Sequence, residues 1–139
     1  MPSLERSVLV DVPLSRAYAV VTEIERYPEF LPACSSVRVL QRDDDTIQAK
    51  VTAGGMGMRE TFSTTNVLTE DAVTLVLEDG PFDYLRGEWH FAAVGDDVCR
   101  VILQLEFQPK GLLKHVMAGL IPTVADKMVS AFVKRMVKV

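Results

Sequence analysis

The chain has 139 residues and a net charge of −4; 48% of its residues are hydrophobic and 24% are charged. This composition argues against intrinsic disorder and suits one globular domain that needs no disulfide or metal to complete its core. The two cysteines match no zinc or redox spacing, so we expect buried thiols. No apolar run reaches the roughly 20 residues of a membrane-spanning helix, and the start lacks a signal peptide's apolar core. We expect a monomeric cytoplasmic domain over residues 1–139, without a cofactor.

Charge is unevenly distributed along the chain. Residues 1–109 contain 18 acidic and 9 basic side chains, whereas residues 110–139 contain 6 basic side chains and a single acidic one, Asp126. The overall acidity argues against bulk nucleic-acid binding. The basic C-terminal end nevertheless offers a local surface to an anionic partner.

The first 40 residues predict a strand and then a helix. Residues 4–11 are rich in Val and Leu, which favours a strand. Ser15 is a suitable N-cap for a helix over residues 15–26, where apolar side chains recur at helical spacing. Pro28 and Pro32 then bracket a segment that can form at most a short helical turn.

Between residues 37 and 108 the hydrophobic pattern has a period of two. Six apolar segments are separated by turn signals such as residues 43–45 (Asp-Asp-Asp), 79–81 (Asp-Gly-Pro) and 95–97 (Gly-Asp-Asp). Turns of hairpin length favour an antiparallel meander with one apolar face.

Helical periodicity returns over residues 110–138, and Pro122 predicts a kink within this helix. The order of elements is therefore β-α-β6-α, an α+β fold in which a seven-stranded curved antiparallel sheet packs around the long C-terminal helix. Because one helix cannot fill all the space above a curved sheet, we expect an internal cavity that binds an apolar molecule.

Four short motifs, spread along the whole chain, carry a likeness to a known family. They are residues 27–34 (Tyr-Pro-Glu-Phe-Leu-Pro-Ala-Cys), 79–82 (Asp-Gly-Pro-Phe), 99–101 (Cys-Arg-Val) and 128–132 (Met-Val-Ser-Ala-Phe). In this order they resemble the coenzyme Q-binding START-domain family. The glycine-rich residues 53–58 and Pro122 depart from the family pattern.

The resemblance implies a helix-grip fold of the START and Bet v 1 type. Mitochondrial members of that family bind coenzyme Q (ubiquinone) and support respiration without being known catalysts. A closely related bacterial member is described as a toxin that blocks the association of ribosomal subunits. Many similar proteins carry the general description polyketide cyclase or dehydrase.

The side chains expected to line the cavity come from most parts of the chain. Tyr27, Phe30 and Leu31 form a lip over the cavity mouth, or instead pin the first helix to the sheet. Methionines adapt to irregular apolar ligands, and Trp89 is either a core residue or a ligand contact. The expected ligand-binding residues are Tyr27, Phe30, Leu31, Met56, Met58, Glu60, Phe62, Leu85, Trp89, Phe91, Leu103, Leu105, Val116, Leu120, Val124, Met128 and Phe132.

Two charged features have alternative interpretations. Alternation places Glu60 on the apolar face, where a protonated carboxyl group donates a hydrogen bond to a quinone carbonyl, unless a bulge after Gly57 turns it outward. Lys127, Lys134, Arg135 and Lys138 form a basic edge of the last helix. This edge contacts an anionic membrane or ribosomal RNA, or merely solvates the outer face.

Three functions follow from these features. The leading one is a non-enzymatic carrier that binds ubiquinone or a similar polyprenyl lipid, with peripheral contact to the inner membrane. The alternative is a toxin-like protein that binds the large ribosomal subunit and blocks subunit association. An enzyme that acts on polyketide-like substrates is the third, and we do not expect it because the inward faces offer few titratable groups besides Glu60 and Cys99.

Overall fold

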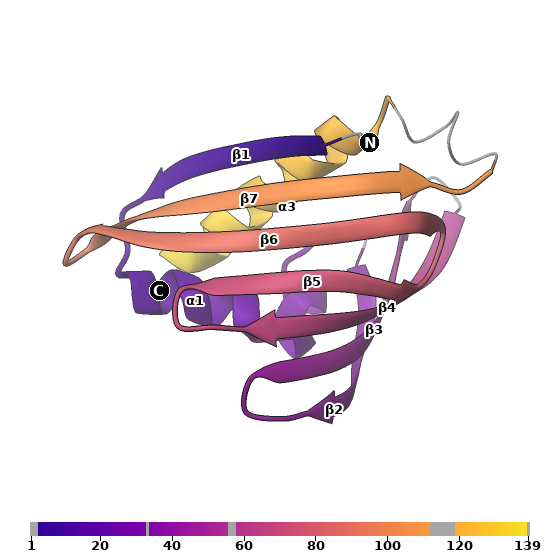
Figure 1. The fold of residues 1–139 in the computed structure, drawn as a ribbon. Coiled ribbons are helices and arrows are strands. Elements are labelled where there is room, and N and C mark those ends of the chain that lie inside the picture. Colours follow the sequence, from indigo (N-terminus) through magenta and orange to yellow (C-terminus); the bar gives the residue numbers. More distant parts are fainter. Residues whose placement is uncertain (1–2, 33, 56–57, 112–118, 139) are drawn as a thin grey trace.

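The computed structural model describes residues 3–32, 34–55, 58–111 and 119–138, and Figure 1 shows an antiparallel sheet with helices on one side. Its seven strands have the order β1-β7-β6-β5-β4-β3-β2, so the first strand pairs with the last. They are β1 (Ser3–Val10), β2 (Cys34–Arg42), β3 (Thr46–Gly55), β4 (Met58–Leu68), β5 (Ala72–Asp79), β6 (Phe82–Gly95) and β7 (Val98–Pro109). The predicted α+β helix-grip architecture is confirmed.

The side of the sheet that faces the helices, here called the concave face, carries the alternating apolar side chains. In β7 the buried residues Val101, Leu103 and Phe107 all point to this side, as period-two alternation requires. On β6, Trp89 lies opposite Leu103 and Phe91 lies opposite Val101. The period-two pattern therefore identified both the strands and their buried face.

The prediction of one continuous helix over residues 15–26 is wrong. The chain forms α1 (Leu14–Thr22) and then a separate 3-10 helix, η1 (Ile24–Glu29), with a non-helical residue between them. Pro28 lies inside η1, and its ring and missing N–H oppose the continuation of an α-helix. Ser15 is not the N-cap, because α1 begins one residue before it.

The predicted long helix over residues 110–138 is wrong at its start. The last helix, α3, spans Ile121–Val137 and follows a turn at residues 119–120, so it is roughly 25 Å long. Pro122 lies in its first turn, where a missing N–H removes no intrahelical bond. Proline therefore marks the beginning of the helix instead of kinking it. Residues 112–118 lie outside the described residues.

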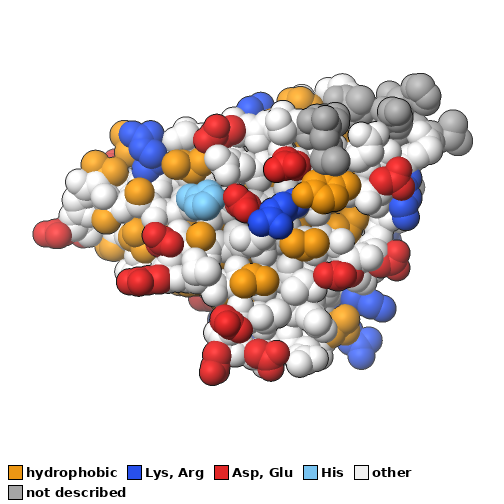
Figure 2. Space-filling model, in the orientation of Figure 1, with side chains coloured by type: hydrophobic (Ala, Val, Ile, Leu, Met, Phe, Trp, Pro, Cys, Tyr) orange, Lys and Arg blue, Asp and Glu red, His pale blue; other side chains and the backbone are white. Residues whose placement is uncertain are grey.

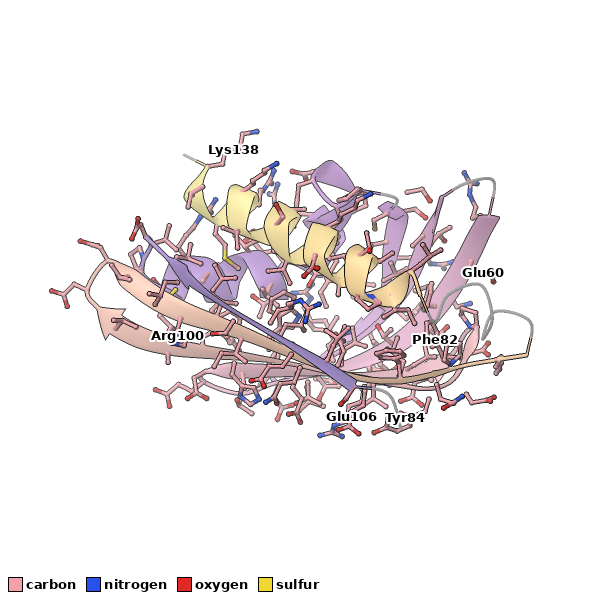
Figure 3. All side chains as sticks on the ribbon, turned by 90° about the horizontal axis from the view of Figure 1, so that it is seen from above. Glu60, Phe82, Tyr84, Arg100, Glu106 and Lys138 are labelled. Atoms are coloured by element: carbon pink, nitrogen blue, oxygen red, sulfur yellow. The ribbon has the colours of Figure 1, made fainter. Side chains whose placement is uncertain are left out.

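Three apolar cores lie on the helix side of the sheet; one of them, formed by Ile24, Ile47 and Ala49, contains no residue of α3, and the other two do. The larger of these two joins Phe132 and Met136 of α3 to residues of α1, β6 and β7. The other consists of Phe82, Phe107 and Ile121 at the beginning of α3. In Figure 3, Phe82 lies on the helix side of the sheet and Tyr84 on the opposite side. α3 thus spans from one core to the other.

Candidate functional site

An aromatic cluster holds η1 against α3 and the sheet. Phe132 of α3 is 2% exposed, and its ring centroid lies 4.9 Å from that of Trp89, 5.2 Å from Tyr27 and 5.3 Å from Phe30. The Tyr27 hydroxyl also donates to the backbone carbonyl of Val21, and burial raises the pKa of Tyr27. Of the two roles considered for the Tyr27–Leu31 segment, this geometry matches the one that pins the first helical region to the core.

The side chain of Arg135 connects α3 to the end of η1. Its guanidinium forms a 2.6 Å ion pair with Glu29 and lies 5.2 Å from the centre of the Phe30 ring. The hydrogen bond from Arg135 is the main cause that lowers the pKa of Glu29, and electrostatic attraction to Arg135 and Arg26 adds to it. Arg135 is therefore engaged within the protein, unlike the lysines beside it.

Arg16 of α1 stabilises the C-terminal end of α3. Its guanidinium donates hydrogen bonds to the backbone carbonyl oxygens of Arg135 (2.9 Å), Met136 (3.1 Å) and Lys138 (3.1 Å). Carbonyl groups at a helix C-terminus lack the usual intrahelical partners, although the Arg135 carbonyl also accepts from the Lys138 N–H, and a positive charge is favourable there. Local sequence patterns do not predict this contact because it joins residues about 120 positions apart.

A groove of about 840 Å³ runs between the proline-containing segment at the end of η1, residues 28–32, and the outer side of α3. We call it the α3 groove, and it is lined by Pro28, Glu29, Phe30, Leu31, Pro32, Thr123, Asp126, Lys127, Ser130, Ala131, Lys134, Arg135 and Lys138. A neighbouring hollow of about 360 Å³ shares Phe30, Arg135 and Lys138 with it and adds Arg16 and Arg26. All four residues of the predicted basic edge therefore border one groove.

The free positive charge of the α3 groove comes from three lysines. Glu29 is paired with Arg135, and Asp126 is paired with Arg6 of β1. Among the described residues, Lys127, Lys134 and Lys138 form no ion pair within the protein. Their charges are consequently available to an anionic partner.

Part of the concave face is less tightly covered than the rest. The inward-facing side chains of Val51, Phe62, Leu75, Leu77 and Leu105 are only half-buried, although they belong to the apolar face. A fully packed core would leave such residues almost inaccessible. This part of the sheet therefore retains apolar surface that an apolar molecule can cover.

Glu60 lies on the concave face. The pairing between β3 and β4 runs without a register shift from Thr46–Val67 to Gly55–Met58, so no bulge separates Glu60 from Phe62. Glu60 is half-buried opposite Ala53, and Figure 3 shows it at the end of the molecule remote from Lys138. The alternative in which a bulge turns it outward is wrong for this strand pair.

Two buried polar residues on the same face were not identified from the sequence. Thr64 and Asn66 follow Phe62 at two-residue spacing and are only 5% and 4% exposed. The Asn66 amide nitrogen donates to the Ile47 carbonyl oxygen (3.3 Å) and to the Thr64 hydroxyl (3.2 Å). Their two-residue spacing from Phe62 indicates that they share its face of the sheet. The polar residues around them, however, are typical of a strand that faces solvent.

The other predicted lining residues fall into three groups. Phe91 and Leu103 are buried, and Leu85, Leu105 and Met128 are half-buried against the apolar cores. Leu120 and Val124 are 43% and 45% exposed, so their expected place inside the cavity is wrong. Ala125 and Val129 of α3 are buried, and this helical phase turns Val124 outward. Met56, Val116 and the side chain of Met58, which were also expected to line the cavity, lie outside the described part of the structure.

The outer face of the sheet, seen in Figure 2, mixes acidic, basic and hydrophobic side chains. Glu88 pairs there with Arg86 at 2.9 Å and with His90 at 3.3 Å, and these hydrogen bonds lower its pKa. Within the described part of the chain, no helix is long and apolar enough to cross a membrane, and no three His, Cys, Asp or Glu side chains cluster as metal ligands.

A curved seven-stranded sheet with α3 across its concave face defines a helix-grip domain. Residues 10–134 match the family described as "Polyketide cyclase / dehydrase and lipid transport", and the chain belongs to this family. It is also similar to the ribosome association toxin RatA of Pseudomonas aeruginosa, with 37% identity over 134 residues that cover 95% of this chain and 93% of that protein.

Solved structures of low sequence identity share the fold. The Zhui aromatase/cyclase of a Streptomyces species matches with a TM-score of 0.89 at 13% identity, covering 97% of this chain and 93% of that one. A START superfamily protein from Mycobacterium smegmatis matches with a TM-score of 0.79 at 16% identity, covering 96% and 93%. At these identities the likeness concerns the fold alone.

Proposed function

We propose that this protein acts in the cytoplasm by binding the large ribosomal subunit and preventing its association with the small subunit. The observation that carries the proposal is the α3 groove with its three lysines, which form no ion pair among the described residues, in a chain similar over nearly its full length to a ribosome association toxin. This ranks the ribosomal function above the ubiquinone carrier expected from the sequence.

Electrostatics favour this surface over the rest of the molecule. The chain is acidic overall, so a phosphate-rich partner is repelled by most of its surface and attracted where the lysines gather. Each lysine that neutralises a phosphate releases counterions, which makes such binding strongly dependent on salt. The proline-bracketed segment opposite the lysines gives the groove a defined wall.

The experiment compares two charge-reversal variants in cells. In the first, Lys127, Lys134 and Lys138 are changed to Glu. The second is a control that reverses three exposed basic residues on the outer face of β2–β4, namely Arg38, Lys50 and Arg59. Overproduction of the wild type and the control is expected to reduce joined ribosomes in gradient profiles, and the groove variant is expected not to. Equal profiles for all three proteins would contradict the proposal.

A second candidate function rests on a different observation. We propose that the half-buried concave face binds an apolar small molecule, with a quinone or polyprenyl lipid as the first candidate. The membership of a family whose description includes lipid transport supports this proposal. Covering these side chains would contribute roughly 25 cal/mol for each Å² removed from water.

Extraction of the purified protein with organic solvent, followed by mass spectrometry, tests this second function. A Phe62→Trp variant, which adds volume on the concave face, serves as the blocked control. A stoichiometric apolar molecule in the wild type that is lost in the variant is expected. Empty extracts from protein made in a quinone-producing bacterium would count against ligand binding.

A further inference from the structure

The buried pair Thr64 and Asn66 has hydrogen-bonding capacity that the described residues of the protein do not use. Both nitrogen-bound hydrogens of the Asn66 amide are taken, one by the Ile47 carbonyl and the other by the Thr64 hydroxyl oxygen. Among the described residues, no donor reaches the Asn66 Oδ1 atom, and no acceptor takes the hydroxyl hydrogen of Thr64. One acceptor and one donor therefore remain side by side.

The orientation of the Asn66 amide is fixed by its neighbour. The carbonyl oxygen of Ile47 can only accept a hydrogen bond, so the amide must turn its nitrogen toward Ile47. Its oxygen is consequently turned away from that strand. No fully buried side-chain polar atom of the described residues lacks a partner, so the Asn66 Oδ1 atom, to which none of these residues donates, keeps some accessible surface although Asn66 as a whole is only 4% exposed.

The surroundings of the pair are apolar; its neighbours on β3 are buried, and those on β5 are partly accessible. Across the sheet, Thr64 lies opposite Leu77 and Ala49, while Asn66 lies opposite Leu75. Leu75 and Leu77 are half-buried, and Ala49 contributes only a methyl group. A molecule that covers the leucines thus brings its polar group next to Thr64 and Asn66.

We propose that Thr64 and Asn66 anchor the polar end of an apolar ligand and select a hydroxyl group over a carbonyl or ether group. A hydroxyl donates to the Asn66 Oδ1 atom and accepts from the Thr64 hydroxyl, which satisfies both free positions. An oxidised quinone or an ether only accepts, so it leaves the asparagine oxygen unpaired in an apolar site, at a cost in affinity. The ligand class is therefore a hydroxyl compound with an apolar tail, of which phenols and quinols are examples. This inference rests on the second proposed function, the binding of an apolar molecule.

The test compares two probes that differ in one hydrogen-bond donor. Isothermal titration calorimetry of the full chain with 4-pentylphenol and with 4-pentylanisole measures how much the hydroxyl hydrogen contributes to binding affinity. We expect the phenol to bind about five- to thirty-fold more tightly than its methyl ether. Asn66→Leu is expected to abolish this ratio, and Thr64→Val to weaken both probes.

Thr65→Val is the matched control, because Thr65 is the neighbouring threonine but points to the outer face, where it bonds to Glu78 at 3.0 Å. It is expected to leave the ratio unchanged. Thermal melting verifies folding, and Asn66→Ala replaces Asn66→Leu if the latter unfolds. Equal wild-type affinities for the two probes would overturn the anchor while leaving apolar-ligand binding intact. Failure of both probes to bind would overturn both proposals.

Discussion

Replacing Phe132 by alanine tests whether the aromatic cluster fixes α3 on the sheet. The side chain is 2% exposed and has three aromatic neighbours within 5.3 Å, so its removal leaves a cavity that the rigid rings of Trp89 and Tyr27 cannot fill. Core Phe→Ala substitutions cost about 3–5 kcal/mol, and each lost aromatic pair adds to the transfer cost. We expect about 4 kcal/mol, which is a large part of the roughly 5–15 kcal/mol stability of a domain.

Urea unfolding followed by tryptophan fluorescence measures this loss, because Trp89 is the single tryptophan and touches Phe132. The corresponding fall in Tm is about 10–20 °C for a domain of this size. Val137→Ala is the control, since Val137 lies on the same helix but is 49% exposed, and it is expected to change stability by less than about 0.5 kcal/mol. A loss below about 1.5 kcal/mol for Phe132→Ala would refute the reasoning.

Three further predictions concern the supports of α3 and the thiols. Arg16→Met removes the three hydrogen bonds to the end of α3 and is expected to cost about 1–3 kcal/mol in urea unfolding; no change would deny it a capping role. Because Arg135 lowers the pKa of Glu29 in the folded state, their pairing stabilises fully above the ordinary value of 4.5 and is lost as the pH falls through the lowered pKa. Glu29→Gln should therefore flatten the acid limb of a stability–pH curve, and an unaltered limb would contradict the pairing. Burial raises the pKa of both Cys34 and Cys99, so a thiol reagent at neutral pH should label them only after unfolding.

The strands were predictable from the sequence, whereas the helix boundaries were not. Period-two alternation identifies a half-buried strand wherever it occurs, and turn signals separate the strands clearly. Pro122 is compatible both with a kink and with the first turn of a helix, and only the tertiary structure distinguishes these positions. Val124 was expected to line the cavity, but the helical phase that buries Val129 and Phe132 leaves it exposed.

The candidate sites were predictable in part, for a similar reason. The basic edge of α3 is local in sequence, so helical spacing alone brings Lys127, Lys134 and Lys138 together. The opposite wall of the groove comes from residues about 100 positions earlier in the chain, and no local sequence pattern predicts that the two walls meet. Thr64 and Asn66 were missed because a polar pair is expected to face solvent, and its burial depends on which neighbouring strands cover it.

The most direct test of the ribosomal proposal is the affinity of the full chain for isolated large and small subunits over a range of salt concentrations. We expect preferential binding to the large subunit, with an affinity that falls steeply with salt. Changing Lys127, Lys134 and Lys138 to Glu should lower the affinity and reduce the slope of log K against log salt by about 2–3. Reversing Arg38, Lys50 and Arg59 should preserve both quantities. Absence of binding to either subunit, or binding that is insensitive to the three groove lysines, would contradict the account.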